Sequence, residues 1–159
     1  MRTYITGRTG RLGAVLEESF RKRGDEIARD IRNVNYLVFA HRYRGEEWYD
    51  AEMRANVTQV VRLIDAAMWA PGDTAIVIVS SVSATAPAIN QSLAYNLSKA
   101  ALNQLARCYA TKYRINTVSP DTFTGDNPKV TKQQVANVIS FLCSSLSSGI
   151  NGQDIKVTG

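Results

Sequence analysis

Residues 6–13 of this 159-residue chain read TGRTGRLG and join a β-branched and aromatic run, residues 2–6, to a segment of helical periodicity. The glycines Gly7, Gly10 and Gly13 fall three residues apart. In such a turn glycine lets the chain leave a strand sharply, lets the backbone approach a pyrophosphate, and lets a helix pack tightly on a sheet. The first helical turn offers free N–H groups to an anion. We therefore expect a dinucleotide-binding turn here in preference to an ordinary one.

Strand and helix patterns alternate from this turn to the C-terminus. Continuous apolar or β-branched runs predict strands at residues 2–6, 26–28, 36–40, 75–79, 114–119 and 155–157. Apolar residues at helical spacing predict helices at residues 11–23, 50–69, 93–111 and 132–144. This alternation predicts an α/β fold, a Rossmann-type three-layer sandwich with a parallel sheet of five or six strands, in one domain over residues 1–159.

The composition is that of an ordinary globular protein, with 45% hydrophobic and 21% charged residues, which excludes a disordered chain or a coiled coil. The N-terminus lacks the apolar segment of a signal peptide, and no apolar run is long enough for a membrane span, so we expect a cytoplasmic protein with no membrane partner. The net charge of +5 is spread along the chain, which argues against a nucleic-acid partner.

Histidine and cysteine are too sparse for a metal site. His41 is the single histidine, and we expect it in a loop near the dinucleotide, with no metal bound. The two cysteines, Cys108 and Cys143, are too few for a disulfide scaffold, and both lie in helical apolar patterns. We therefore predict that both are reduced and packed in the core.

Tyr95 and Lys99 lie four residues apart in the sequence YNLSK, at the start of a predicted helix. Positions four apart share one helix face, so the phenol and the ammonium point the same way. A phenol has a pKa of about 10, and a nearby cation lowers that pKa because it favours the phenolate. The pair therefore suits proton transfer to or from a carbinol oxygen, and the alternative is a surface pair with no role.

Four segments together carry a family resemblance. VSSVS at residues 79–83 followed by YNLSKAA at residues 95–101 resembles the active-site stretch of short-chain dehydrogenases/reductases. RINTVSP at residues 114–120 and INGQDIKV at residues 150–157 are similar to later segments of the same family, and Asn56 sits where the family has a helix asparagine. The resemblance covers nearly the whole chain, apart from one deletion.

The resemblance implies an oxidoreductase that moves a hydride between NAD(P)H and a small carbonyl or alcohol substrate. It implies that Tyr95 is the general acid/base and that Lys99 lowers the pKa of Tyr95 and binds the nicotinamide ribose. A serine would hydrogen-bond the reacting oxygen; Ser81 fits the family position better, and Ser83 is the alternative. Asn56 would hold a water in a proton relay. The family also assembles through its helices, so the resemblance implies a homodimer or homotetramer.

The residues that we expect at the cofactor lie in the glycine turn and at the ends of later strands: Thr6, Gly7, Arg8, Gly10, Arg11, Leu12, Gly13, Arg29, Ala40, His41, Tyr95, Lys99, Pro120, Thr122 and Thr124. Thr122 and Thr124 are alternatives for the contact to the nicotinamide carboxamide. Arg8, Arg11 and Arg29 favour NADP over NAD, because a guanidinium pairs well with a 2′-phosphate. Asp30 is close by, so NAD stays possible.

Two departures from the family pattern concern the adenine end of the cofactor. The strand at residues 36–40 runs into His41 and Arg42 where the family has an Asn-Asn-Ala-Gly element. Only residues 24–35 fill the space in which the family has a strand, a helix and another strand. We therefore expect an exposed adenine and weak cofactor binding that falls as ionic strength rises.

Two other functions stay open. The shortened fold is compatible with a catalytically idle NAD(P)-binding sensor or scaffold, although the retention of Asn56, Ser81, Tyr95 and Lys99 together argues against it. The spacing of the glycines resembles the extended branch of the family and suggests a nucleotide-sugar reductase or epimerase. The chain lacks the C-terminal sugar-nucleotide domain of that branch, which argues against this function.

Overall fold

In the computed structural model, the chain forms one parallel sheet with the strand order β2-β1-β3-β4-β5-β6. The structure describes residues 1–46, 49–67, 74–87 and 91–159. The strands are β1 (Arg2–Thr6), β2 (Glu26–Ile27), β3 (Tyr36–Phe39), β4 (Ala75–Val79), β5 (Arg114–Pro120) and β6 (Asp154–Val157). All five neighbouring pairs are parallel. The predicted strands and their parallel sheet are therefore confirmed, with ends that differ by a residue.

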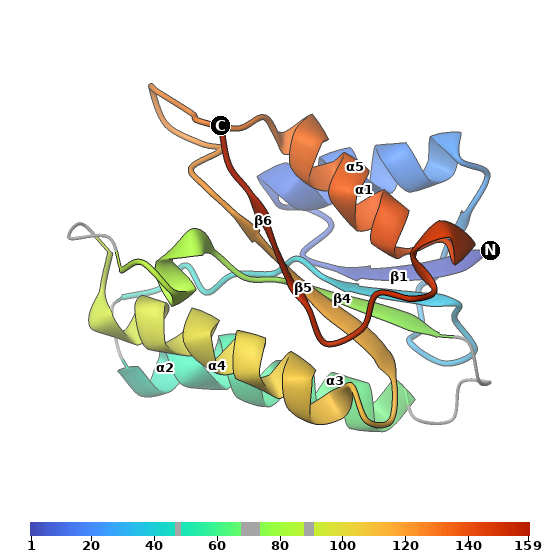
Figure 1. The fold of residues 1–159 in the computed structure, drawn as a ribbon, viewed down its shortest axis with the longest axis horizontal. Helices are drawn as coiled ribbons and strands as arrows, with labels where there is room; N and C mark the ends of the chain where they lie inside the picture. The colour runs from blue at the N-terminus through green and yellow to red at the C-terminus, as the bar shows by residue number, and fades with distance from the viewer. Residues whose placement is uncertain (47–48, 68–73, 88–90) are drawn as a thin grey trace.

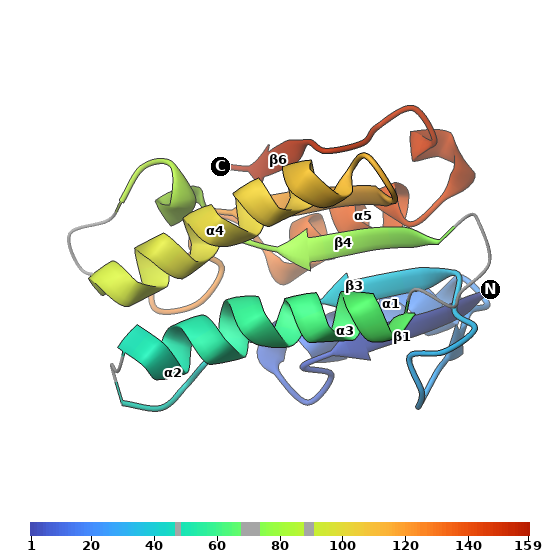
Figure 2. The ribbon, with the colours of Figure 1, turned by 90° about the horizontal axis from the view of Figure 1, so that it is seen from below.

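Helices cover both faces of this sheet and complete the predicted three layers. They are α1 (Arg11–Lys22), α2 (Tyr49–Met53), α3 (Gln59–Ala67), α4 (Leu93–Tyr109) and α5 (Lys132–Leu142). α1 and α5 lie side by side on one face, and α2, α3 and α4 lie on the other (Figure 1 and Figure 2). The central strands β3 and β4 are buried along their whole length, which explains their continuous apolar runs.

Each face of the sheet has its own apolar core. Leu16 and Phe20 of α1 pack with Ile139 of α5 on one face. On the other face, Ile64 of α3 packs with Leu102 of α4. The helices thus bury the stripes that their sequence periodicity predicted, and they leave the carboxyl ends of the strands free for a site.

The edge of the sheet at β2 is reduced, as the short segment before β3 predicted. β2 pairs with β1 through two residues, and residues 28–35 return to β3 without a helix. Ala28 and Val34 of this connection are buried in the core shared with α3. The connection therefore covers part of the face that a longer chain would cover with a helix.

Two predictions about helices were wrong. The helix expected over residues 50–69 is divided by a π-helical turn, Arg54–Thr58, between α2 and α3; its last two residues lie outside the described residues. Cys108 is exposed, because the buried face of α4 runs through Leu102 and Ala106 and Cys108 points away from it. Cys143 is buried, as predicted, and it is not in a disulfide.

Two features are absent from the part of the chain that the structure describes. No helix there combines the length and the apolar character that a membrane crossing requires. No group of three or more His, Cys, Asp or Glu side chains there is arranged to hold a metal ion.

We predict that Gly13→Ala lowers the free energy of unfolding by about 3 kcal/mol, because overpacking against backbone cannot relax cheaply. A Cβ at Gly13 would lie 2.0 Å from the carbonyl oxygen of Gly7. The matched control is Gly149→Ala, since a Cβ at Gly149 meets nothing within 4 Å. Urea denaturation of both variants measures the effect, and equal stabilities would contradict the close packing of α1 on the glycine turn.

Candidate active site

The candidate site lies where the parallel strands end. Because β1, β3, β4 and β5 run the same way, their carboxyl ends meet at one edge of the sheet. The residues that follow these strands are Gly7, Ala40 and Ser80, and Pro120 ends β5. Segments far apart in sequence are thereby brought to one place.

The glycine turn has the geometry that a pyrophosphate requires. Gly7 has a φ of +68°, and a Cβ there would lie 2.8 Å from the Cα of His41. Gly10 is the N-cap of α1, and no side chain caps the helix. The N–H of Gly10 donates to the carbonyl of Gly7 at 2.8 Å, while the N–H groups of the first helical turn have no intrahelical acceptor. The turn therefore presents unpaired donors to an anion, and the residues present fit a dinucleotide.

A cavity of about 270 Å³ runs from this turn to the predicted catalytic pair. Gly10 and Leu12 line one end, His41 lines the wall, and Tyr95 and Lys99 line the other end. Expected cofactor residues from three segments, the glycine turn, residues 40–41 and the start of α4, are thus brought together along one path. That path is continuous from the helix N-terminus to the phenol, as a dinucleotide would need.

Tyr95 and Lys99 project from the first turns of α4. The hydroxyl of Ser92 caps the helix by accepting from the N–H of Tyr95 at 3.2 Å, and the helix begins at Leu93. Lys99 is only 3% exposed, and its Nζ donates to the carbonyl of Val79 at 3.0 Å. The Nζ lies 5.6 Å from the centroid of the Tyr95 ring. The predicted pairing of phenol and ammonium on one helix face is therefore present.

A second cation reaches the same phenol. The guanidinium carbon of Arg42 lies 4.8 Å from the centroid of the Tyr95 ring. Burial, with the charge of Arg42 adding to it, lowers the pKa of Lys99 to about 8, and the carboxylate of Glu52 acts in the opposite direction. Two cationic groups therefore lie within 6 Å of the centroid of the Tyr95 ring.

Asn56 lies in the π turn and is buried behind the cavity. Its Oδ1 accepts from the backbone N–H of Tyr43 at 3.2 Å, and its Nδ2 donates to Ser98 Oγ at 3.1 Å and also to the carboxylate of Glu52. Single π turns often occur at functional sites. The Asn56 side chain thus joins the loop after β3, α2 and α4, and it does not line either cavity beside Tyr95.

His41 is held by both of its ring nitrogens. Nε2 lies 2.8 Å from the carbonyl of Ala55, which can only accept, so Nε2 carries the proton. Nδ1 of the neutral ring therefore accepts from the hydroxyl of Thr6, at 2.7 Å. Burial lowers the pKa of His41 and keeps the ring neutral. His41 lines the cavity, as expected, and also ties β1 to the π turn.

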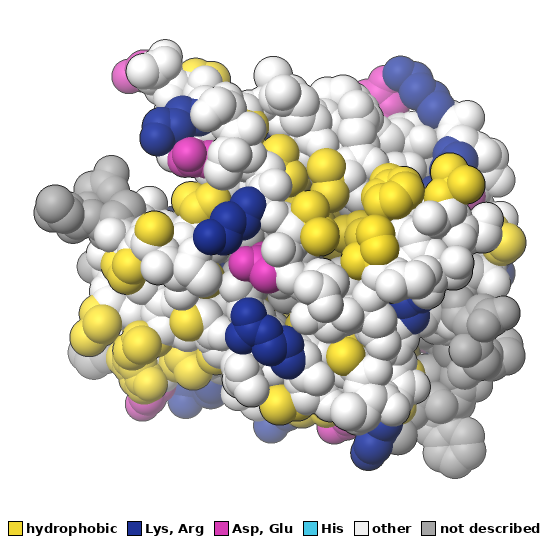
Figure 3. Space-filling model, in the orientation of Figure 1, with side chains coloured by type: hydrophobic (Ala, Val, Ile, Leu, Met, Phe, Trp, Pro, Cys, Tyr) yellow, Lys and Arg dark blue, Asp and Glu magenta, His cyan; other side chains and the backbone are white. Residues whose placement is uncertain are grey.

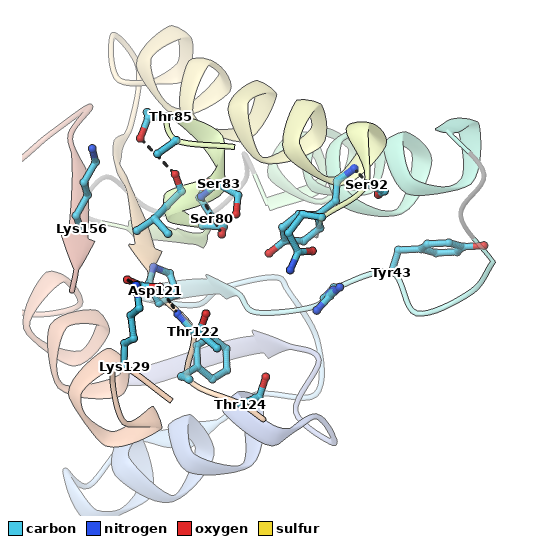
Figure 4. A pocket seen from close by; sticks show the side chains of 18 of the residues that line it. Tyr43, Ser80, Ser83, Thr85, Ser92, Asp121, Thr122, Thr124, Lys129 and Lys156 are labelled. Carbon is cyan, nitrogen blue, oxygen red and sulfur yellow. Dashed lines mark hydrogen bonds and ion pairs between the residues drawn. The ribbon is translucent and has the colours of Figure 1, made fainter. Parts of the chain in front are cut away.

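A larger cavity of about 1140 Å³ opens on the other side of Tyr95. Ser81 and Ser83 both line it, and the Oγ of Ser81 accepts from the N–H of Ser83 at 3.2 Å, so the choice between them stays open. Thr122 and Thr124 also line it, from the loop after β5 (Figure 4). Pro120 lies with them, and none of the three lines the cavity at the glycine turn, so their predicted contact to the cofactor stays a prediction.

Four expected cofactor residues line neither cavity beside Tyr95. One is Thr6, at the end of β1, which donates to His41. Arg8 forms an ion pair with Glu17 at 3.7 Å and lines a separate cavity of about 370 Å³ beside β1. Arg29 is exposed and lines none of these three cavities. Gly13 is buried in the packing of α1 and lines none of them either.

Sequence reasoning left several charged residues out of the candidate site, including Arg42, Arg44 and Glu52. Arg42 and Arg44 line both cavities beside Tyr95, and Glu52 lines the larger one. The two arginines directly follow β3, so their place at the edge of the sheet was a usable signal. Glu52 stands one helical turn before Asn56, but nothing in its sequence pattern distinguishes it from a surface glutamate.

The comparison with protein families decides the relationship. Residues 40–126, more than half of the chain, match the family model described as enoyl-(acyl carrier protein) reductase. The chain belongs to the short-chain dehydrogenase/reductase family. A search of curated proteins found no match.

Solved structures of short-chain dehydrogenases/reductases share the fold over nearly the whole chain. The 3-alpha-hydroxysteroid dehydrogenase from Pseudomonas sp. B-0831, complexed with NADH, has a TM-score of 0.80 at 22% identity, over 99% of this chain and 94% of that chain. A short-chain dehydrogenase/reductase from Brucella melitensis has a TM-score of 0.85 at 20% identity, over 98% and 94%. The angucycline C-6 ketoreductase LanV with bound NADP has a TM-score of 0.85 at 16% identity, over 98% and 93%.

We predict that burial of Lys99 makes stability depend on pH. Its pKa in the folded protein is about 8, below the ordinary 10.5, so the charged form opposes folding at low pH and this penalty fades as pH rises from 8 to 10.5. Between pH 8 and 10.5, the free energy of unfolding of the wild type should rise by about 3 kcal/mol relative to that of Lys99→Met. Urea denaturation at several pH values measures the difference. Lys112→Met, at an exposed lysine, is the control. The same dependence of stability on pH in Lys99→Met and Lys112→Met would contradict the prediction.

Proposed function

We propose that this chain is an NAD(P)-dependent oxidoreductase that interconverts a small carbonyl compound and its alcohol, with Tyr95 as the proton donor and acceptor. The observation that carries the proposal is the single cavity that joins the uncapped N-terminus of α1 to Tyr95 and Lys99. A bound nicotinamide dinucleotide would supply or accept the hydride. The turn at Gly10 would hold its pyrophosphate, and Tyr95 and Lys99 would line the end where the nicotinamide would bind.

Tyr95 would donate and accept the proton, and its cationic neighbours would stabilise the charge that this leaves on the phenol. In reduction the carbonyl carbon gains the hydride, the carbonyl oxygen takes the proton of the Tyr95 hydroxyl, and the resulting phenolate is stabilised by the charges of Lys99 and Arg42. Oxidation of the alcohol reverses these transfers. General acid/base groups of this kind contribute about 10²- to 10⁴-fold to the rate. Ser81 or Ser83 would hydrogen-bond the reacting oxygen.

Asn56 is supported as a positioning residue. Both of its polar side-chain atoms are engaged, with Tyr43, Glu52 and Ser98, and the Ser98 hydroxyl donates in turn to the carbonyl of Tyr95 at 2.9 Å. These contacts set the start of α4 against α2. The water that the family resemblance implies at Asn56 stays a prediction.

The preference for NADP stays part of the proposal. The carboxylate of Asp30 pairs with Arg32 at 2.5 Å, and this interaction holds the pKa of Asp30 at about 2. A carboxylate already paired is a weaker partner for a ribose hydroxyl, which disfavours NAD. Arg8 is itself paired with Glu17 and lines the separate cavity next to β1, so the preference rests on Asp30.

Association with a second copy of the chain is also proposed. Leu93 and Leu97 of α4 are 72% and 43% exposed. Exposed large apolar side chains on one helix support a homodimer or homotetramer, as the resemblance implied. Cytoplasmic localisation stays a prediction.

We predict that Tyr95→Phe lowers kcat by about 10²- to 10⁴-fold and leaves the Kd for NADPH nearly unchanged, because only the acidic hydroxyl is lost. Turnover of a panel of aldehydes and ketones and fluorescence titration with NADPH measure the two quantities. Tyr113→Phe, in the connection between α4 and β5, is the matched control. Wild-type kcat in Tyr95→Phe would rule out the proposed mechanism, and absence of turnover in the wild type, with NADPH bound, would favour the sensor.

We predict that Glu52→Gln moves the alkaline limb of the kcat/KM profile to lower pH. The charge of Glu52 raises the pKa of Lys99 against the effects of burial and Arg42. Without it, Lys99 loses its proton at a lower pH, while the amide oxygen of glutamine still accepts from Asn56. Glu18→Gln, at an exposed glutamate on α1, is the control. An unshifted limb in Glu52→Gln would show that Lys99 does not sense this carboxylate.

A further inference from the structure

The larger cavity has an excess of positive charge. Its lining includes five cationic side chains, namely Arg11, Arg42, Arg44, Lys129 and Lys156, and two carboxylates, Glu52 and Asp121. Lys129 and Lys156 come from the loop after β5 and from β6 (Figure 4). The space-filling view shows several Lys and Arg side chains beside β6 on this face of the molecule (Figure 3).

Both carboxylates already have partners within the protein. Asp121 Oδ2 lies 3.5 Å from Lys129 Nζ, and Glu52 accepts from Asn56. Within the described part of the chain, no carboxylate lies at ion-pair distance from Arg42, Arg44 or Lys156. These three cationic side chains line the cavity and have no ion-pair partner among the described residues.

A cofactor accounts for only part of this charge. Arg11 begins α1, beside the turn that would hold the pyrophosphate, and Arg42 and Arg44 also line the smaller cavity. Of the two cavities beside Tyr95, Lys156 lines only the larger one. It belongs to the edge strand β6, whereas the glycine turn follows β1, near the opposite edge of the sheet. Its charge lies on the side where a substrate would enter.

The uncharged lining of the larger cavity is rich in hydroxyl groups. Ser83, Thr85, Ser92, Thr122 and Thr158 all line it. Hydroxyl donors and unpaired cations are the groups that bind the oxygens of carboxylates and phosphates. An apolar substrate would instead leave these polar groups unpaired on binding, which costs free energy.

We propose that the substrate of this site is a small carbonyl compound or alcohol that carries a carboxylate or phosphate group, held by Lys156 and the neighbouring hydroxyls while its carbonyl meets Tyr95. This substrate class rests on the proposed function. The shared requirement is an anionic group at one end and a carbonyl at the other.

Paired substrates test the class by turnover. Succinic semialdehyde is compared with butanal, 4-carboxybenzaldehyde with benzaldehyde, and glyceraldehyde 3-phosphate with glyceraldehyde, each with NADPH. We expect kcat/KM to favour the anionic member of at least one pair by about tenfold or more, as for one charged hydrogen bond. The favoured pair identifies the anion as carboxylate or phosphate. The preference should weaken in high salt, because these side chains are exposed.

Lys156→Gln should lower the ratio of kcat/KM for the anionic and neutral members by about tenfold. Arg44→Gln is a second variant at the same cavity, and Lys112→Gln removes the same charge from an exposed position outside it. Equal kcat/KM values within every pair, or the same ratio in Lys156→Gln as in Lys112→Gln, would overturn the anionic class and leave the proposed function intact.

A binding experiment separates the two proposals. NADP-loaded protein is titrated calorimetrically with benzoate against benzyl alcohol and with glycerol 3-phosphate against glycerol. Tighter binding of an anionic ligand that Lys156→Gln abolishes supports the class, even where no aldehyde is turned over and the oxidoreductase proposal fails. Equal binding of both ligands in each pair contradicts it.

Discussion

The two hydrogen bonds of the His41 ring hold together the parts of the chain on which the site depends. Thr6 ends β1, His41 follows β3, and Ala55 belongs to the π turn beside Asn56. The Cα of His41 also lies where a side chain at Gly7 would point, so the glycine turn closes against the same residue. The phosphate end and the proton-transfer end of the cavity thereby share one anchor. A neutral ring with one fixed tautomer is needed for this, and burial supplies it.

The buried charge of Lys99 is held at a cost to stability. Lys99 is buried with one carbonyl as its hydrogen-bond acceptor, and Arg42 stands over the same phenol. Glu52 is the carboxylate that offsets these cations, and it is held by Asn56 instead of by a direct ion pair. Burying an ammonium with so few partners costs free energy, and a purely structural core would be more stable without it. Buried charges of this kind are more typical of functional sites.

Local pattern was enough to predict the strands, the glycine turn and the shared face of Tyr95 and Lys99, because each depends on residues close in sequence. The π turn at Arg54–Thr58 could not be predicted, since one widened turn leaves the apolar periodicity on both sides nearly intact. The partners of Asn56 come from the loop after β3 and from α4, so only the folded chain reveals them. Arg29 was expected at the cofactor from its place after β2, but this short strand leaves it exposed outside the described cavities.

The two-residue strand β2 also affects how the molecule meets other chains. An edge strand offers a row of unpaired backbone groups, and long edges recruit strands from other molecules and promote aggregation. Here one edge is a two-residue strand whose Glu26 forms an ion pair with Arg2, and the other, β6, carries Lys156. The two edge strands of this parallel sheet are therefore short or carry a charged side chain. The sheet therefore offers little free backbone for pairing with strands of other molecules.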